Sequence, residues 1–304
     1  MPATSSLASP RTVLALILAA ACWGIGTVVS KRAVAEIPAL TLLPIQLAVS
    51  LGALALLMRC RHLPFRDSSA SPILGRLGIL NPGLAYALSL LGLAHITASL
   101  SVMLWAIEPL LILLLAGWIL RERIGSSLVV LSIVAAGGML LVIYQPGGAA
   151  SPLGVLLTLA GVACCATYTV GARRWLSTAA STAQVVAAQQ TYALGLAIVL
   201  SAVAWLVGGA PQFAAVTPAG WGSAIASGIL YYGLAYWLYL SALRDVPAST
   251  ASASFYMIPV FGVAGGVTLL GEALQPSQWL GVTIVMAAIF AILRRTSAPD
   301  PQNA

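Results

Sequence analysis

Long apolar runs, separated by short polar connections, occupy most of this sequence. Ten of them approach the roughly 20 residues that an α-helix needs to cross about 30 Å of hydrocarbon. The runs cover residues 12–30, 40–59, 72–93, 97–120, 126–144, 153–172, 182–207, 218–243, 248–270 and 276–293. The pattern predicts an all-α integral membrane protein with ten transmembrane helices.

The composition is that of a membrane protein, and it argues against nucleic-acid binding and against a separate catalytic domain. Of the 304 residues, 60% are hydrophobic and only 7% are charged, which is too few polar groups to cover a water-soluble domain. The 14 lysines and arginines occur in ones and twos between apolar runs, so they form no basic face for nucleic acid. The longer polar pieces are the two tails and the loop at 59–71, which leaves no room for a separate catalytic domain.

Metal, cofactor and enzymatic chemistry find little support in the sequence. The four cysteines lie in or at the ends of apolar runs without a CxxC spacing, and His62 and His95 form no cluster with them. No GxxxxGK[ST] motif for ATP is present. We therefore expect no enzyme and no cofactor. The expected partners are a small-molecule substrate and membrane lipid, with no nucleic acid and no obligatory protein partner.

The basic residues predict an orientation in the membrane. If the N-terminus is cytoplasmic, only Lys31 and Arg32 fall outside. Twelve arginines then fall on the inside: Arg11, Arg59, Arg61, Arg66, Arg76, Arg121, Arg123, Arg173, Arg174, Arg244, Arg294 and Arg295. Cytoplasmic ends are enriched in Lys and Arg, so we expect both termini in the cytoplasm.

The two halves of the chain share an outline. Residues 97–122 match 247–272 at a spacing of 150, residues 86–99 match 236–249 at the same spacing, and residues 19–32 match 161–174 at a spacing of 142. The shared positions include Ala98 and Ala248, Ser99 and Ser249, Trp105 and Phe255, Pro109 and Pro259, and Glu122 and Glu272. A repeat of this length predicts two related units.

Five helices in each unit make the second unit start from the opposite side of the membrane. The repeats are therefore expected to be inverted. Residues 1–148 form the first five-helix repeat with a cytoplasmic N-terminal tail. Residues 149–304 form the second, inverted repeat with a cytoplasmic C-terminal tail.

Glu108 is the only acidic residue deep within a predicted span. A carboxylate inside the membrane is costly and by default marks a substrate or ion pathway. Ser101, Trp105, Glu108 and Ile112 share one helical face, and an aromatic ring one turn before an acid is a plausible seat for an ammonium group. The alternative is a protonated carboxyl group that is hydrogen-bonded to a neighbouring helix. The second repeat has Ile258 at this position.

Prolines within apolar runs are candidate hinges. Pro82, Pro109 and Pro259 each remove a backbone hydrogen bond in mid-span, and Pro82 stands in an Asn81-Pro82-Gly83 sequence. Such breaks can line a cavity with backbone, and kinks that serve only packing are the alternative. The second repeat has Tyr231-Tyr232-Gly233 in place of Asn81-Pro82-Gly83, so we expect this break in the first repeat alone.

Charges at helix ends suggest gates. Lys31 and Arg32 end the first helix on the outside, where the ninth helix ends at Glu272. On the inside, the equivalent set is Arg173 and Arg174 with Glu122. We hypothesise an ion pair across the repeats at each membrane face. The alternative is interfacial charges that only fix helix ends, because exposed ion pairs contribute little.

Together, the inverted duplication, Trp23-Gly24 in the first helix, the Tyr86 and Tyr236 segments with their Ala-Ser pairs, and the closing Glu122 and Glu272 resemble the drug/metabolite transporter superfamily. The resemblance covers nearly the whole chain and lies in the bacterial EamA-type branch. Within it, the Trp105 helix is most similar to the inner-membrane exporters of aromatic amino acids.

The resemblance implies a multi-pass protein of the bacterial inner membrane with an alternately opening central cavity. Carried onto this sequence, the substrate-binding candidates are Trp23, Tyr86, Trp105, Tyr168, Tyr232, Tyr236, Phe255 and Tyr256; Asn81 and Glu108 join them from the residue patterns above. One departure is Cys165-Ala166, which stands where the first repeat has Trp23-Gly24. The expected function is secondary export of amino acids, aromatic ones above all, or of similar small organic solutes. The alternative is export of drugs or organic cations.

Overall fold

The computed structural model describes residues 10–60, 72–108, 111, 112, 115, 126–143, 151–176, 182–243 and 253–296, and every regular element within them is helical. Six long helices are continuous: α1 (Pro10–Val34), α2 (Ala39–Cys60), α7 (Ser126–Ile143), α8 (Pro152–Leu176), α9 (Thr182–Gly208) and α14 (Pro276–Thr296). Their ends differ from those of the predicted runs by at most four residues. Apolar run length therefore sets these helix boundaries.

The other four predicted runs contain more than one element or are described in part. Residues 72–95 comprise α3 (Pro72–Arg76), η1 (Leu77–Ile79), η2 (Leu80–Leu84) and α4 (Ala85–His95). Residues 218–243 comprise α10 (Pro218–Ser227), η4 (Gly228–Leu234) and α11 (Ala235–Leu243), after a short η3 (Phe213–Ala215). Helix α5 spans Ala98–Trp105, and η5 (Ala253–Met257) leads into α13 (Ile258–Leu270).

Two of these interruptions occupy equivalent places in the two halves. Both η2 and η4 are π-helical, and Ala85 and Ala235, 150 residues apart, each start the α-helix that follows. In η2 the backbone of Asn81 is extended (φ −143°, ψ 119°), and the Asn81–Pro82 peptide is cis. The prediction that only the first repeat is broken here is wrong, because a π-helical turn needs no proline. Such turns are frequent at functional sites.

The candidate hinges differ in their surroundings. Pro82 lies inside the distorted η2, as expected. Pro259 does not interrupt an α-helix; it occupies the first turn of α13, directly after the 3₁₀ helix η5, where a missing N–H leaves no bond unmade. The type of helix changes directly before Pro259, and its role as a hinge stays a prediction. Pro109 lies outside the described residues.

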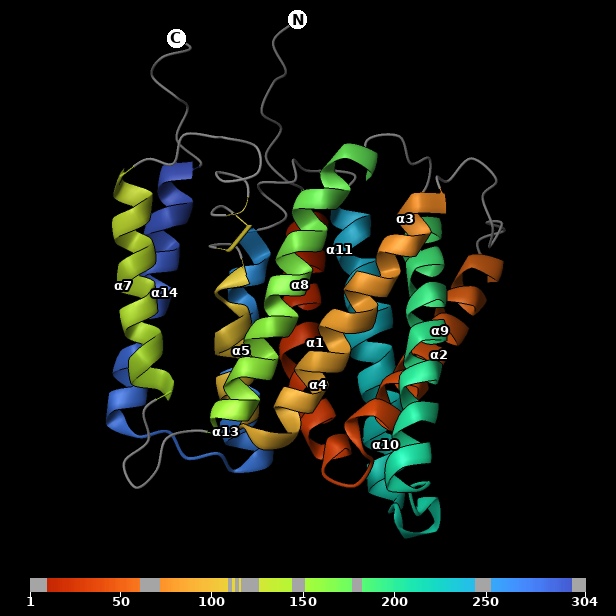
Figure 1. Cartoon of the computed structure of the whole chain (residues 1–304). Helices are drawn as coiled ribbons and strands as arrows, with labels where there is room; N and C mark the ends of the chain where they lie inside the picture. Colours follow the sequence, from red (N-terminus) through yellow and green to blue (C-terminus); the bar gives the residue numbers. More distant parts are fainter. Residues whose placement is uncertain are drawn as a thin grey trace, which may run out of the picture.

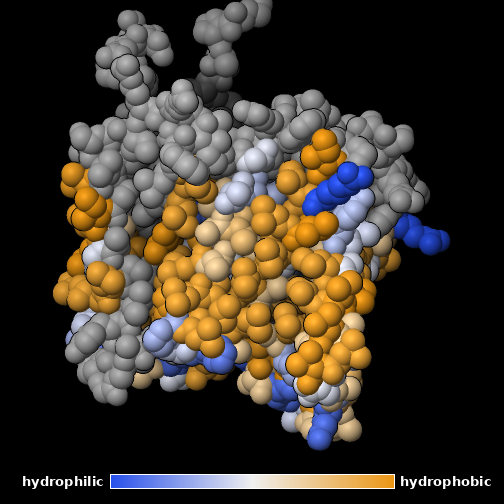
Figure 2. Space-filling view, viewed as in Figure 1, coloured by the Kyte–Doolittle hydropathy of each residue, from blue (hydrophilic) through white to orange (hydrophobic). Residues whose placement is uncertain are grey.

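The surface and the helix lengths are those of a protein embedded in a membrane. Among the residues that the structure describes, five stretches are long and apolar enough to cross a bilayer: Pro10–Val34, Ala39–Cys60, Leu77–His95, Pro152–Thr169 and Gln184–Gly208. On the face shown in Figure 2, hydrophobic residues cover the middle of the molecule and hydrophilic residues gather near its ends. The full count of ten spans stays a prediction.

The helices form a bundle in which segments distant in sequence lie side by side. Figure 1 shows α7 and α14 paired at one edge, and α2 beside α9 at the other. Between these pairs, α1 packs against α13 and α11, whereas α8 packs against α5 and α4. Both ends of the chain emerge on one side of the bundle (Figure 1).

Glycines allow backbones to approach at two equivalent crossings. A Cβ atom on Gly78 would collide with the backbone of Gln189 on α9, and a Cβ atom on Gly228 would lie 2.8 Å from the carbonyl oxygen of Gln46 on α2. Gly78 and Gly228 are 150 residues apart, and Gln46 and Gln189 are 143 apart. The same glycine–glutamine contact is thus made twice, each time between opposite halves of the chain.

Candidate functional site

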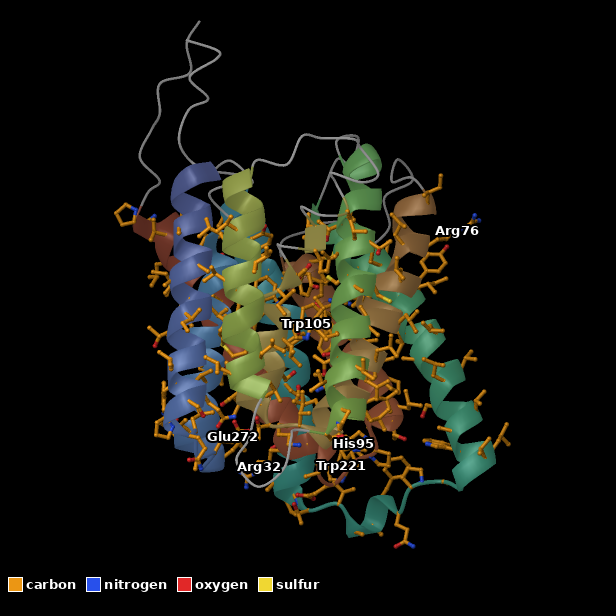
Figure 3. All side chains as sticks on the ribbon, turned by 60° about the vertical axis from the view of Figure 1, so that its left-hand side comes forward. Arg32, Arg76, His95, Trp105, Trp221 and Glu272 are labelled. Atoms are coloured by element: carbon orange, nitrogen blue, oxygen red, sulfur yellow. The ribbon has the colours of Figure 1, made fainter. Side chains whose placement is uncertain are left out.

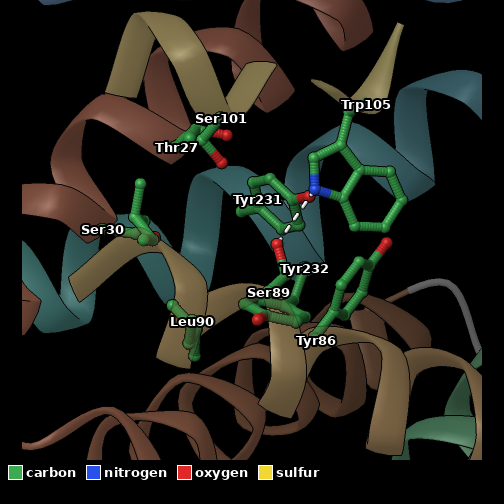
Figure 4. Close-up of a pocket in the computed structure, with 10 residues that line it drawn as sticks. Thr27, Ser30, Tyr86, Ser89, Leu90, Ser101, Trp105, Tyr231 and Tyr232 are labelled. Atoms are coloured by element: carbon green, nitrogen blue, oxygen red, sulfur yellow. Dashed lines mark hydrogen bonds between the residues drawn. The ribbon is translucent and has the colours of Figure 1, made fainter. Parts of the chain in front are cut away.

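A small cavity lies where α1, α4, α5 and η4 meet (Figure 4). Its lining combines aromatic rings with small hydroxyl groups, and none of its side chains is charged. The lining residues are Thr27, Ser30, Tyr86, Ser89, Leu90, Leu93, Ser101, Trp105, Tyr231 and Tyr232. A largely apolar pocket with a few convergent polar groups is the usual form of a small-molecule site.

The aromatic rings of the cavity are held by one another and by a hydroxyl group. Trp105 Nε1 donates a hydrogen bond to Ser89 Oγ at 2.9 Å. The ring of Tyr86 lies 5.7 Å from that of Trp105, 5.4 Å from Tyr231 and 5.3 Å from Tyr232, measured between centroids. Edge-to-face contacts of this kind fix ring orientation. The walls of the cavity are therefore preorganised.

Three of the predicted substrate residues line the cavity: Tyr86, Trp105 and Tyr232. The lining also contains Tyr231 and four serine and threonine side chains, which were not among the predicted substrate contacts. A signal for Thr27 existed, because the match of residues 19–32 with 161–174 repeats it as Thr169. No comparable signal marked Ser30 or Ser89, since isolated serines are common in membrane helices.

Three other predicted residues, Trp23, Tyr236 and Phe255, pack beside the cavity and do not line it. Trp23 meets the rings of Tyr236 at 5.4 Å and Phe255 at 5.3 Å, and Phe255 stacks on Tyr239 at 4.8 Å. These rings fill one another's space, and their role in substrate binding stays a prediction. The two groups are joined where Tyr86 OH and Tyr236 OH share a hydrogen bond of 2.7 Å.

Tyr168 and Asn81 are not among the residues that line this cavity. The hydroxyl of Tyr168 accepts a hydrogen bond from Gln189 Nε2 at 2.6 Å. Asn81 is 6% exposed, and its Oδ1 has no hydrogen-bond partner. The side chain of Tyr256 lies outside the described residues.

Glu108 faces a second group of side chains. Its carboxyl group is hydrogen-bonded with the thiol of Cys165 on α8, and it lies close enough to Tyr231, Tyr236 and Tyr239 to interact with them electrostatically. It is not among the cavity-lining residues, although Trp105 on the same helical face is. A hydrogen bond to a neighbouring helix is thus what the structure shows, and the ammonium seat between Trp105 and Glu108 stays a hypothesis.

Lys31 and Glu272, the predicted outer ion pair, are hydrogen-bonded to backbone groups at helix ends. Lys31 Nζ donates to the carbonyl oxygens of Leu93 (2.8 Å) and Ala94 (3.5 Å), at the C-terminal end of α4. The Glu272 carboxylate accepts from the backbone N–H groups of Ala98 (2.6 Å) and Ser99 (2.9 Å), at the N-terminus of α5. A cation at a helix C-terminus and an anion at an N-terminus both complement the helix dipole.

Lys31 and Glu272 still interact electrostatically, but their hydrogen bonds hold helix ends. A left-handed Gly271 (φ 67°) ends α13, and the N–H of Glu272 donates to Gly266 O at 3.0 Å, which turns the side chain of Glu272 toward α5. Figure 3 places Glu272 and the exposed Arg32 at the end of the bundle opposite the termini. Of the predicted inner set, Glu122 and the side chains of Arg173 and Arg174 lie outside the described residues.

A third charged side chain, which was not predicted, is hydrogen-bonded to a helix end on the side of the bundle opposite the termini. The Glu36 carboxylate accepts from Thr217 N (2.7 Å) and Thr217 Oγ1 (2.9 Å) at the start of α10. Ser30 and Leu93 line the cavity directly beside the hydrogen bond from Lys31 Nζ to the carbonyl oxygen of Leu93. The end of the cavity that faces away from the termini is therefore bridged by contacts to helix ends.

The Trp105–Ser89 hydrogen bond gives a testable prediction. Trp105→Phe keeps an aromatic ring but removes the N–H donor, so we expect KM for the transported solute to rise about fivefold, in line with roughly 1 kcal/mol per neutral hydrogen bond. Trp205→Phe is a matched control, because Trp205 Nε1 makes the same 2.9 Å bond to Thr41 Oγ1 away from the cavity. Equal KM changes in both variants would contradict a role in binding.

Helices of membrane-spanning length around a small, uncharged, aromatic cavity define a membrane solute carrier. The chain belongs to the EamA-like transporter family of the drug/metabolite transporter superfamily, whose sequence model matches residues 10–144 and 152–294. The family assigns the protein to transport across a membrane.

Of three relatives with similar sequences, two are described as transporters. The uncharacterized transporter YwfM of Bacillus subtilis is 34% identical over 88 residues, 29% of either chain. An uncharacterized transporter of Archaeoglobus fulgidus is 25% identical over 290 residues, 93% of this chain and 98% of its own. The uncharacterized protein PA1977 of Pseudomonas aeruginosa is 31% identical over 183 residues, 60% of each chain. The matched segments thus span less than two thirds of YwfM and PA1977, and nearly all of the Archaeoglobus protein.

One crystal structure of a protein with 15% identity superposes with a TM-score of 0.66, over 94% of this chain and 99% of the other. At this identity, the likeness shows a shared fold.

Proposed function

We propose that this protein is a secondary transporter that exports aromatic amino acids, or similar small organic solutes, across the bacterial inner membrane. The observation that carries the proposal is the cavity lined by Tyr86, Trp105, Tyr231 and Tyr232 together with four hydroxyl-bearing side chains. Aromatic walls bind the ring of such a solute by burial and edge contacts. The hydroxyl groups can donate to its carboxylate and accept from its ammonium group.

The absence of charge among the ten lining residues suits a zwitterion. An amino acid carries both charges itself, so a site without a fixed charge binds it without a large electrostatic bias. Weak binding of this kind favours release on the far side of the membrane. A carrier must bind its substrate well enough to select it and loosely enough to let it leave.

Alternating access through two inverted five-helix repeats, with both termini in the cytoplasm, completes the proposal. Three observations support it. The family matches the chain in two separate segments, the glycine–glutamine crossings recur with their halves exchanged, and Tyr86 meets its own repeat equivalent, Tyr236. Contact between equivalent residues is expected at a two-fold axis. Exchanging the shapes of two such repeats moves a central site from one side to the other.

A second candidate function, export of organic cations, is favoured by Glu108. Its carboxyl group lies near three tyrosines, Tyr231, Tyr236 and Tyr239, and aromatic rings beside a carboxylate attract a cation. We prefer amino acid export to cation export because the carboxyl group of Glu108 is hydrogen-bonded with Cys165 and does not line the cavity.

Counterflow in proteoliposomes tests both functions. Vesicles loaded with unlabelled phenylalanine are expected to accumulate radiolabelled phenylalanine, and Trp105→Ala should reduce this at least tenfold while Trp205→Ala does not. A parallel series uses tetraphenylphosphonium, with and without a pH gradient. Exchange of tetraphenylphosphonium without exchange of any amino acid would replace the first proposal by the second. Exchange of neither solute class would overturn both.

Glu108→Gln separates the two candidates further. Because Glu108 lies outside the cavity lining, we expect the variant to keep phenylalanine counterflow within about twofold and to lose any tetraphenylphosphonium exchange, since a neutral amide no longer attracts a cation. Cys165→Ser is the control, because it keeps a hydrogen-bond partner for Glu108. A tenfold loss of phenylalanine counterflow in Glu108→Gln alone would show that the carboxylate takes part in amino acid transport.

A further inference from the structure

The two repeats keep the same local contacts. Thr27 Oγ1 donates to the carbonyl oxygen of Trp23 at 3.1 Å, and Thr169 Oγ1, 142 residues later, donates to that of Cys165 at 3.0 Å. Other helical threonines, such as Thr158 and Thr268, make the same bond, so what the repeat keeps here is threonine at the equivalent position. The surroundings of a residue in one repeat can therefore be used to locate the surroundings of its equivalent.

The same holds for the helices that carry the aromatic residues. Trp105 on α5 contacts Ser89 on α4, and the residues 150 positions later, Phe255 and Tyr239, stack on each other at 4.8 Å. The contact is kept although both residue types differ. The geometry of the fold imposes it.

The cavity residues can be carried across the repeat in this way. Their described equivalents are a second set of residues, and the two sets are in contact where Tyr86 OH and Tyr236 OH share a hydrogen bond. Thr27 corresponds to Thr169, Tyr86 to Tyr236, Ser89 to Tyr239, Trp105 to Phe255, Tyr231 to Asn81 and Tyr232 to Pro82. We refer to Asn81, Thr169, Tyr236, Tyr239 and Phe255 as the second set.

In this structure Trp23 occupies the space among three members of the second set. Its indole ring lies 5.4 Å from Tyr236, 5.7 Å from Tyr239 and 5.3 Å from Phe255, and it is only 7% exposed. The repeat equivalent of Trp23 is Cys165, a far smaller residue. One set is therefore open as a cavity, and the other is filled by an indole ring.

Asn81 gives an independent indication of a ligand. It is 6% exposed and its Oδ1 lacks a hydrogen-bond partner. A buried acceptor without a partner is costly, and it calls for an explanation such as a ligand or an ordered water. Its repeat equivalent, Tyr231, lines the open cavity, so Asn81 stands where a ligand would contact it if the second set opened.

We propose that the second set forms a second substrate cavity, which opens toward the other side of the membrane when Trp23 withdraws from Tyr236, Tyr239 and Phe255. It takes a small solute with an aromatic body, which replaces the indole ring, and an amino group that donates to Asn81 Oδ1. The inference rests on the proposed alternating access. It adds the residues that bind in the alternate state and makes Trp23 the group that closes this cavity.

Thr27 and Thr169 offer a matched pair for the test, because they occupy equivalent positions with equivalent hydrogen bonds. Each is changed to cysteine in a variant in which Cys22, Cys60, Cys164 and Cys165 are replaced by alanine. Proteoliposomes are treated with a membrane-impermeant methanethiosulfonate from either side. We expect Thr27→Cys to react from one side and Thr169→Cys from the other, and phenylalanine to slow both reactions. Adding Trp23→Ala should speed the Thr169→Cys reaction at least fivefold and leave Thr27→Cys within twofold.

Reaction of both cysteines from the same side overturns the proposal, as does a Thr169→Cys that stays unmodified even with Trp23→Ala. Asn81→Ala adds a binding readout: KM for phenylalanine should rise about fivefold or more from the side of the second cavity only. A KM change that is equal from both sides contradicts the assignment of Asn81. Counterflow by the cysteine-free parent, measured in the same vesicles, reports on the proposed function separately, because labelling detects the cavity whether or not phenylalanine is transported.

Discussion

Glu272→Ala is expected to lower transport at least tenfold and to destabilise the folded protein. The carboxylate accepts from two backbone N–H groups, those of Ala98 and Ser99, and these residues are 0% and 1% exposed. Water cannot replace the lost acceptor, and charge-assisted hydrogen bonds contribute about 1.5–3 kcal/mol each. Helix α5 carries Trp105 at its other end, so loosening its N-terminus also displaces a wall of the cavity.

The matched control is Glu36→Ala. Glu36 binds the N-terminus of α10 through Thr217 in the same way, but it is exposed, so solvent can replace its oxygens. We expect a change of less than twofold in counterflow and little change in Tm in detergent. A Glu272→Ala variant that transports like Glu36→Ala would show that the cap is dispensable. Glu272→Gln should fall between the two, because an amide keeps one acceptor oxygen and loses the charge.

The sequence predicts the long helices well because one physical quantity determines them. A bilayer core requires about 20 apolar residues per span, and the runs at 12–30 and 40–59 become α1 and α2 with few residues added at either end. The π-helical turn at 228–234 could not be predicted in this way. Its sequence contains no proline, and its cause is tertiary, since Gly228 packs against the backbone of Gln46.

The candidate site was predictable in part. Tyr86, Trp105 and Tyr232 line the cavity because the repeat marks the helices that surround the centre. Trp23 was named from the family resemblance, and it packs on other aromatic rings, since a resemblance does not reveal which rings contact one another. The charges at Lys31 and Glu272 were found in the right region. Their hydrogen-bond partners were not, because the backbone groups at a helix end leave no mark in the pattern of side chains.

Among substitutions that add one methyl group at the helix crossings between the two halves, Gly78→Ala should destabilise the folded protein most. The added Cβ would collide with the backbone of Gln189, which cannot move aside as a flexible side chain would. Overpacking a tight interface typically costs about 1–3 kcal/mol, and this contact is closer than most. We expect a Tm in detergent lower by several degrees and loss of most transport activity.

The repeat turns this substitution into a graded series. In Gly228→Ala the added Cβ would lie 2.8 Å from the carbonyl oxygen of Gln46, which is a less severe collision than that of Gly78→Ala. A Cβ on Gly222 would meet nothing within 4 Å. Gly222→Ala also lies on an exposed helical surface, where alanine is favoured over glycine by about 1 kcal/mol. The expected order of Tm is therefore Gly222→Ala at or above the parent, then Gly228→Ala, then Gly78→Ala. If Gly78→Ala and Gly228→Ala match Gly222→Ala, the close crossings of η1 with α9 and of η4 with α2 do not hold the two halves together, and the structural argument for paired, inverted repeats loses its main support.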